Sequence, residues 1–227
     1  MAILAIETST GYLSVAVLNE DRLVVRDCLA GQKHSELILP MIADALAGAA
    51  VERKSIRAIA FGAGPGSFTG LRIACGVAQG LAFGLAVPVI PVSTLEAVAE
   101  ANGGERVAVA LDARMGEIYF AAFERDRENW KVVLDGQLCR PDALPPLPGH
   151  GWCGAGSGFA MYGQTLLYRY QDQLADVDYD AAPHARTIAR LAWLRYQDGK
   201  AVPAAEALPI YIRNKVALTV DEQAVGR

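Results

Sequence analysis

The sequence predicts an α/β protein of two lobes, each built on a mixed β-sheet from a repeated βββαβα unit. The first observation is element order, because strand-like and helix-like runs succeed one another as βββαβαβ over residues 3–92. The second is connection length: short turns joining the first three strands suit antiparallel pairing, and the later crossovers are long enough for parallel pairing. The third is that the same order restarts at residue 106, which indicates an internal duplication.

The first lobe opens with three strand-like runs, at 3–7, 12–18 and 23–29. We expect a helix over 35–48 to follow them. Pro40 lies beyond its first turn, so a kink or a late start is expected there, because proline removes a backbone donor. The helix is apolar almost all round, and such helices are normally covered on both sides.

A glycine-rich loop follows the next expected strand, at 56–61. Its glycines are Gly62, Gly64, Gly66 and Gly70. Their spacing matches neither a P-loop nor the dinucleotide fingerprint. A strand, a glycine turn and a helix in succession can aim backbone N–H groups at an anion. The simpler interpretation is a tight turn in which glycine permits unusual dihedrals and close backbone approach. Ser67 and Thr69 are interpreted as N-cap residues.

The helix expected over 69–85 carries glycine at every fourth position, as Gly76, Gly80 and Gly84. Each interior glycine costs about 1 kcal/mol relative to alanine, and close approach of another backbone is the usual compensation. One stripe of this helix mixes small, polar and aromatic side chains. Its members are Arg72, Gly76, Gln79, Phe83 and the bordering Gly80. We interpret the stripe as a docking groove; the alternative is a helix sandwiched inside its own domain. A strand at 88–92 follows.

The second lobe repeats this pattern in a degenerate form. Strands are expected at 106–111, 116–123 and 131–134. Asp112 follows the first of them as Glu7 follows the first strand of the chain. A proline-rich connection at 141–148 replaces the first helix, and residues 154–158 echo the glycine loop.

A further helix is expected over 183–197, and the tail at 203–216 is expected to pack back on one of the lobes. The last residues look disordered. The predicted domains are an N-terminal lobe at 1–100 that carries the partner-binding helices, a second, degenerate lobe at 101–202, and a C-terminal segment at 203–227 that packs back on the lobes.

Composition indicates an ordinary globular protein of the cytoplasm. The 227 residues carry a net charge of −4 and a pI near 5.4, which argues against a large nucleic-acid surface. Four scattered cysteines lack zinc spacing and are interpreted as buried thiols of a reducing compartment. The N-terminus lacks the features of a signal peptide, and residues 73–92 make a poor membrane span because of Gln79, Pro88 and Pro91. We expect a cytoplasmic protein without membrane association.

The histidines do not form a recognisable catalytic or metal centre. His34, His150 and His184 are far apart and show no metal-ligand spacing. His34 opens a helix, so capping or solvent exposure is the expected role. No base for a serine nucleophile is identifiable from spacing. We therefore predict no catalytic residue, no metal and no cofactor.

Two acids occupy the places where a two-lobe phosphotransferase would hold its phosphate loops and metal. Glu7 and Asp112 are these residues, and together with Gly64 and Gly66 they are the candidates for facing a nucleotide. The residues that follow each acid lack the paired glycines that let backbone approach phosphate. Asp112 and Arg114 can equally form a local ion pair. The pattern favours a fold built for catalysis whose own site is largely missing.

Several motifs together resemble the TsaB (YeaZ) family along essentially the whole chain. They are ILAIETST, HSELILPMI, GAGPGSFTGLRI, IPVSTLEAVA, LDARMGEIYFA and PIYIRNKVA. The resemblance implies an actin/sugar-kinase/Hsp70-like (ASKHA) fold of two ribonuclease-H-like lobes. It also implies a role in making threonylcarbamoyladenosine (t6A) at position 37 of tRNAs that read ANN codons. In that role the chain would be a non-catalytic partner of the transferase TsaD, acting with the ATPase TsaE and the enzyme that makes threonylcarbamoyl-AMP.

The same resemblance implies association through the two N-lobe helices, either as a homodimer or with TsaD, and contact with tRNA only indirectly through the complex. The partner-binding residues that it implies are His34, Leu37, Met41, Arg72, Gly76, Gln79, Gly80 and Phe83. Two alternatives remain open. One is an enzyme, either a nucleotide-dependent transferase using Glu7, Asp112 and the glycine loops or a glycoprotease-like peptidase. The other is a stand-alone homodimer with a regulatory role.

Overall fold

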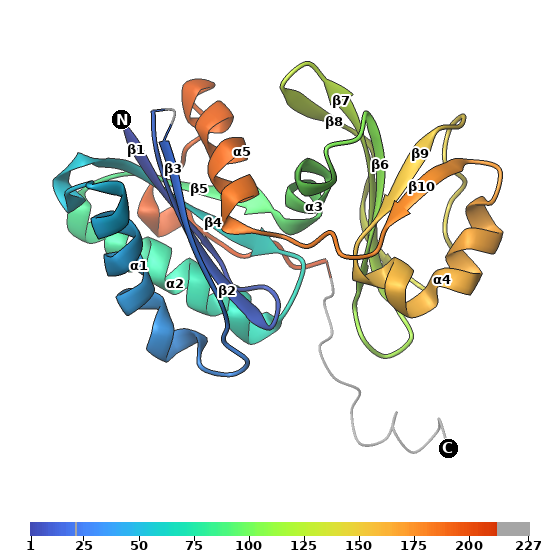
Figure 1. Ribbon diagram of the computed structural model, residues 1–227, viewed down its shortest axis with the longest axis horizontal. Helices are drawn as coiled ribbons and strands as arrows, with labels where there is room; N and C mark the ends of the chain where they lie inside the picture. Colours follow the sequence, from blue (N-terminus) through green and yellow to red (C-terminus); the bar gives the residue numbers. More distant parts are fainter. Residues whose placement is uncertain (21, 213–227) are drawn as a thin grey trace.

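The structure, a computed structural model, describes residues 1–20 and 22–212. These residues form two five-stranded sheets with helices against their faces (Figure 1). The elements in chain order are β1 Ala2–Glu7, β2 Tyr12–Asn19, β3 Arg22–Leu29, α1 His34–Ala49, η1 Arg53–Ser55, β4 Ile56–Gly64, α2 Phe68–Leu85, β5 Val89–Ser93, α3 Thr94–Asn102, β6 Arg106–Asp112, β7 Ile118–Asp126, β8 Asn129–Cys139, β9 Trp152–Ala155, α4 Ser157–Tyr170, β10 Leu174–Asp178, α5 Ala185–Gln197 and η2 Ala204–Glu206.

The first sheet has the strand order β3-β2-β1-β4-β5. Its first three strands pair antiparallel, and β1, β4 and β5 pair parallel, as the connection lengths predict. Successive residues of β1 point to opposite faces. Leu4 and Ile6 join the apolar cluster under α1 and α2, whereas Ile3 and Ala5 join the cluster under α5. Because both faces are covered, β1 is apolar along nearly its whole length.

The second sheet repeats the topology of the first, which confirms the predicted duplication. Its order is β10-β9-β6-β7-β8, so that β6, β7, β8, β9 and β10 correspond to β1, β2, β3, β4 and β5. Helix α4 follows β9 as α2 follows β4. The proline-rich connection at 141–148 stands where the first lobe has α1.

The two lobes exchange one helix each. Helix α3 follows the first sheet but packs in the apolar cluster of β6 and β7, and α5 follows the second sheet but packs on β1, β2 and β4 (Figure 1). The carboxylate of Glu96 on α3 pairs with the guanidinium of Arg195 on α5, which also donates to the Pro91 carbonyl at 2.6 Å. Packing therefore crosses the boundary between the proposed domain ranges 1–100 and 101–202 in both directions.

Some local expectations differ from the structure. Helix α1 is continuous through Pro40 and begins at His34, so it does not start late. Pro40 is exposed, so water can hydrate the carbonyl that proline leaves unbonded. Strand β8 is longer than the predicted 131–134, because bulges in its pairing with β7 let it continue past Asp135 and Gly136. The expected disorder of the last residues falls on 213–227, outside the described residues.

Candidate functional site

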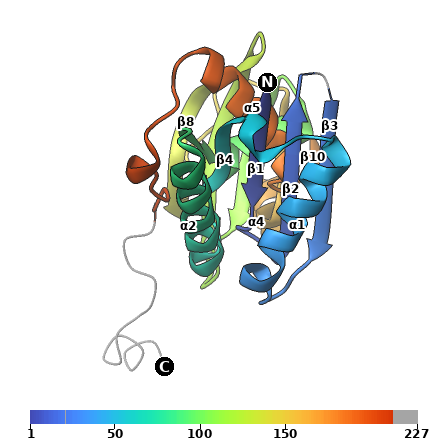
Figure 2. The same cartoon turned by 90° about the vertical axis from the view of Figure 1, so that its left-hand side faces the viewer.

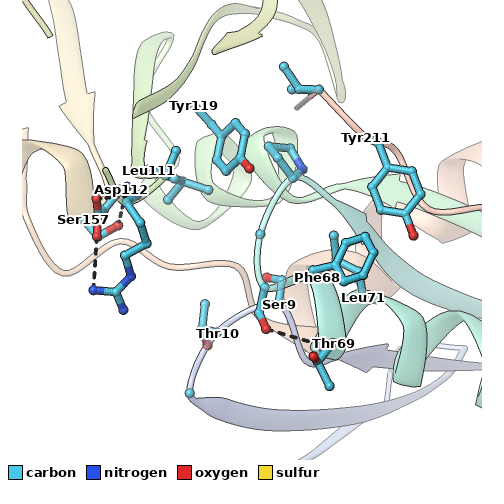
Figure 3. Close-up of a pocket in the computed structure, with 18 of the residues that line it drawn as sticks. Ser9, Thr10, Phe68, Thr69, Leu71, Leu111, Asp112, Tyr119, Ser157 and Tyr211 are labelled. Carbon is cyan, nitrogen blue, oxygen red and sulfur yellow. Dashed lines mark hydrogen bonds and ion pairs between the residues drawn. The ribbon is translucent and has the colours of Figure 1, made fainter. Parts of the chain in front are cut away.

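A cleft of about 1130 Å³ lies between the two lobes. Figure 3 shows side chains of both lobes converging on it. The turn after β1 and the loop before α2 form one wall, and the turn after β6 and the first turn of α4 form the other. The residues labelled in that view are Ser9, Thr10, Phe68, Thr69, Leu71, Leu111, Asp112, Tyr119, Ser157 and Tyr211. The second-lobe residues among them, apart from Asp112, escaped sequence reasoning, although the 154–158 echo points to Ser157.

The acid after the first strand of each lobe folds back on its own turn. One carboxylate oxygen of Glu7 accepts a hydrogen bond from the Ser9 N–H, and Asp112 accepts one from the Arg114 N–H at 2.9 Å. The Asp112 N–H donates to the Ser157 hydroxyl at 3.1 Å. Arg114 also lies 3.5 Å from the Asp112 carboxylate, so the predicted local ion pair is present. The duplication thus includes a shared local contact, because in each lobe the acid after the first strand accepts a hydrogen bond from the N–H two residues further on.

The two acids differ in their access to the cleft. Asp112 lines it, whereas Glu7 is 1% exposed and lies behind it. The second carboxylate oxygen of Glu7 has no hydrogen-bond partner among residues 1–20 and 22–212, and it packs so close to Gly62 that a Cβ there would be 1.8 Å away. Burial raises the pKa of Glu7, and the hydrogen bonds from Ser9 and Thr8 only partly oppose this.

Replacing Glu7 by glutamine should make stability less dependent on pH. Because the pKa of Glu7 is higher in the folded than in the unfolded chain, its contribution is fully present below the unfolded pKa, near 4.5, and is lost as pH rises through the folded value. Between the two values the loss is at most about 1.4 kcal/mol per pH unit. Urea unfolding at pH 4.5, 6 and 8 should therefore show that the free energy of unfolding of Glu7→Gln rises relative to that of the wild type as pH rises.

The control for that series is Glu128→Gln, because Glu128 is exposed on the turn between β7 and β8. It should show no comparable trend. A stability difference between Glu7→Gln and the wild type that stays constant over this pH range would contradict the assignment of a buried acid.

The glycine loop is a tightly packed turn, as the simpler interpretation predicts. A Cβ on Gly66 would lie 2.6 Å from the Cβ of Ser9, and one on Gly70 would lie 1.9 Å from the Thr8 carbonyl oxygen. Gly64 has a φ of +118°, a value that L residues with a side chain rarely adopt. Gly66 lines the cleft, and Gly64 is buried behind it.

The hydroxyl of Ser67 caps α2 by accepting from the Gly70 N–H at 3.3 Å, which confirms one of the two predicted cap residues. Thr69 is instead exposed in the first turn of the helix.

Helices α1 and α2 lie side by side on one face of the first sheet (Figure 2). Helix α2 is long and apolar enough for a membrane span by length and composition alone, yet only 33% of it is buried inside the protein. Phe83 is 84% exposed. A Cβ on Gly76, Gly80 or Gly84 would meet no atom of the described residues within 4 Å. The glycine row is therefore an open surface as far as residues 1–20 and 22–212 are concerned, and none of these residues packs on it.

The eight implied partner-binding residues differ in exposure. Arg72, Gly76, Gly80 and Phe83 are exposed, Leu37, Met41 and Gln79 are half-buried, and His34 is buried. The expectation that His34 caps the helix or faces solvent is wrong. Its side chain is 6% exposed, and its Nε2 lies 3.1 Å from the Tyr12 carbonyl oxygen, so it ties the start of α1 to β2.

The C-terminal segment contacts the same stripe of α2; the sequence predicts that this tail packs back on a lobe but does not indicate which element it contacts. The Gln79 amide donates to the Ala207 carbonyl at 2.9 Å, and the Arg72 guanidinium donates to the Tyr211 hydroxyl at 3.2 Å. The apolar PIYI run at 209–212 is the signal in the sequence that the segment packs, but spacing does not indicate against what.

The cysteines and acids suggest no metal centre in the described ranges. No group of three or more His, Cys, Asp or Glu residues within 1–20 and 22–212 could hold a metal ion. All four cysteines are unpaired, but only Cys75 is buried, so the prediction of buried thiols holds for that residue alone. Burial raises the pKa of Cys75 and of Cys153, and it raises the pKa of Cys139 to about 11.

Comparison with known proteins gives consistent matches. The profile of the family described as "TsaD: tRNA N6-adenosine threonylcarbamoyltransferase" matches residues 28–217. The chain is 38% identical to the tRNA threonylcarbamoyladenosine biosynthesis protein TsaB of Haemophilus influenzae over 95% of each chain. It is 37% identical to the TsaB protein of Escherichia coli over 96% of each chain.

Solved structures agree with these matches. A structure titled "YeaZ from Pseudomonas aeruginosa" is 36% identical, with a TM-score of 0.82 over 92% of this chain and 99% of that one. Component A of (R)-2-hydroxyglutaryl-CoA dehydratase from Acidaminococcus fermentans, 8% identical with a TM-score of 0.50 over 87% of this chain and 99% of that one, shows a likeness of fold alone. The duplicated sheets and these neighbours confirm the predicted ASKHA fold.

Proposed function

The chain belongs to the TsaB (YeaZ) family, and from that membership we propose that it is the non-catalytic subunit needed for threonylcarbamoyl transfer to adenosine 37 of ANN-decoding tRNAs. In this role it binds a TsaD-type transferase through α1 and α2 and supports its activity. The relatives' names supply the pathway. The docking role rests on the surface of this chain.

The observation that carries the proposal is the open glycine row of α2. Three interior glycines cost about 3 kcal/mol of helix stability relative to alanine, and no described residue of the chain approaches them. Phe83 lies on the same side of the helix and is almost fully exposed. A helix of another subunit packed on the row would gain from the close backbone approach and would cover Phe83.

A transferase of the TsaD type suits this surface because its family profile matches most of this chain. Related sequences fold alike, so such a transferase carries a helix pair equivalent to α1 and α2. Two related helix pairs can meet about a pseudo-twofold axis and form a four-helix bundle, and a second copy of this chain could occupy the same surface. We propose that docking to the transferase and homodimerisation are alternatives for one face.

The proposed absence of catalysis is supported by the contacts of the two acids, Glu7 and Asp112, near the cleft. Glu7 is buried against Gly62, and Asp112 holds the Arg114 turn and pairs with the Arg114 guanidinium. Glu7 does not line the cleft, and the Asp112 carboxylate, which does, is already engaged by Arg114. We further propose that TsaE joins through the complex, that tRNA is contacted indirectly, and that the protein works in the cytoplasm without membrane association.

The test is a threonylcarbamoylation assay with purified transferase, ATPase, the enzyme supplying threonylcarbamoyl-AMP, and substrate tRNA. Omitting this chain should lower t6A formation at least about tenfold, and adding it back should restore it. Equal product with and without the chain would reject the proposal. Calorimetry with ATP and Mg²⁺ on the isolated chain tests the enzyme alternative: stoichiometric binding that Asp112→Ala removes would favour it.

A further inference from the structure

The last described segment, residues 202–212, forms a strap along one side of α2 (Figure 2). It starts as a bridge to the edge of β5, where Val202 and Val89 exchange two N–H···O bonds of 2.9 Å. It then passes over α2 at Ala207 and ends at the interlobe cleft, where Ile210, Tyr211 and Ile212 form part of the wall.

The strap is fastened firmly to the first lobe. Ala207 is fully buried, and its carbonyl accepts from the Gln79 amide and from the Cys75 thiol at 3.4 Å. The Ile210 N–H donates to the Ala63 carbonyl at the end of β4, at 2.7 Å. A Cβ on Gly64 would lie 2.7 Å from the Ile210 carbonyl oxygen, so this fastening depends on glycine at that position.

The tip of the strap reaches the second lobe. Tyr211 still contacts the first lobe, since its ring lies 5.6 Å from that of Phe68 and its hydroxyl accepts from Arg72. The next residue, Ile212, packs with the apolar cluster of the second lobe. Its Cδ1 would be 3.1 Å from a Cβ on Gly136 of β8, and the Cδ1 of Leu95 on α3 would be 3.3 Å from the same Cβ. The missing side chain of Gly136 therefore makes a seat that Ile212 occupies beside Leu95.

We propose that the strap is a latch that sets the relative position of the two lobes and hence the width of the cleft. Ile212 is its tip and Gly136 its seat. Tyr211 contacts the first lobe, Ile212 contacts the second, and all three residues from 210 to 212 line the cleft. Freeing the tip therefore lets the cleft widen while the lobes stay joined through α3 and α5. The latch stands independently of docking, although Arg72 brings it into contact with the proposed docking stripe.

Two substitutions break the latch from opposite sides. Ile212→Ala removes the tip, and Gly136→Val fills the seat; Gly136 lies in a strand with no positive φ, so valine suits its backbone. Leu208→Ala is the matched control, because Leu208 lies on the same strap and is 68% exposed. Small-angle X-ray scattering on species of equal mass measures lobe separation, and hydrogen exchange of the peptide containing Ile210 measures release of the strap.

We expect Ile212→Ala and Gly136→Val each to accelerate exchange at Ile210 about tenfold and to increase the radius of gyration, while Leu208→Ala matches the wild type. If the radius of gyration of Ile212→Ala equals that of the wild type, the latch is overturned, whatever the exchange rate at Ile210. Should Gly136→Val fail to fold, Ile212→Ala alone decides, because it removes only half-buried atoms at the end of the strap.

Discussion

Gly80→Arg should reduce binding of a TsaD-type transferase at least about a hundredfold, equivalent to about 2.7 kcal/mol. Gly80 lies in the middle of the open row on α2, where a partner helix would make its closest approach. An arginine there holds the two backbones apart and places an unpaired charge in an apolar interface. Isothermal titration of purified transferase into the variant measures the loss.

The same variant should remain folded, because arginine favours helix more than glycine does and the position is open. Its thermal midpoint should equal or exceed that of the wild type. Gly163→Arg is the control, since Gly163 lies on α4 in the other lobe and a Cβ there would also meet no described atom within 4 Å. Full-strength binding by Gly80→Arg would remove this face from the interface and leave the latch untouched.

Gly80→Arg should weaken homodimerisation as well if a second copy of this chain and the transferase bind the same face of α2. Sedimentation of Gly80→Arg alone should then give a monomer at concentrations where the wild type associates. A dimer that persists in Gly80→Arg would place self-association elsewhere and separate it from transferase docking.

The elements that the sequence predicts well are those with a strong local signal. The strands β1, β2 and β3 and the helices α1 and α2 follow from apolar runs between short turns and from helical spacing. Helix α3 is not predicted, because it follows β5 without an intervening loop and no turn residue marks the end of the strand. Strand β10 is also not predicted, because it is half-exposed and carries two acids among five residues, which is a weak strand pattern.

The candidate site was only partly predictable because its decisive contacts are distant in sequence. The glycine row can be read from spacing, but only the structure shows that no described residue covers it. The bond between Gln79 and Ala207 spans 128 residues, and that between Arg72 and Tyr211 spans 139. Periodicity along one helix carries no information about such pairs. His34 was misjudged for the same reason, since its partner is a backbone carbonyl on another element.

Gly70→Ala should destabilise the protein by at least about 3 kcal/mol, although alanine is ordinarily the better helix residue. The added Cβ would lie 1.9 Å from the Thr8 carbonyl oxygen, a backbone atom held in the turn after β1. The Thr8 hydroxyl also donates to the Gly70 carbonyl at 2.7 Å, so the turn and the helix are bound on both sides of the contact. Neither backbone can move without disturbing the other, and urea unfolding measures the effect.

Gly84→Ala is the matched control in the same helix, and it should change stability in the opposite direction. A Cβ on Gly84 would meet no described atom within 4 Å, so the substitution should gain up to about 1 kcal/mol from helix propensity. A Gly70→Ala variant as stable as the wild type would contradict the packing. Stability changes of opposite sign in Gly70→Ala and Gly84→Ala would distinguish two kinds of glycine in α2. Gly70 is required by the packing of the described residues. Gly76, Gly80 and Gly84 reduce stability and contact none of those residues, so they point to a requirement outside that packing.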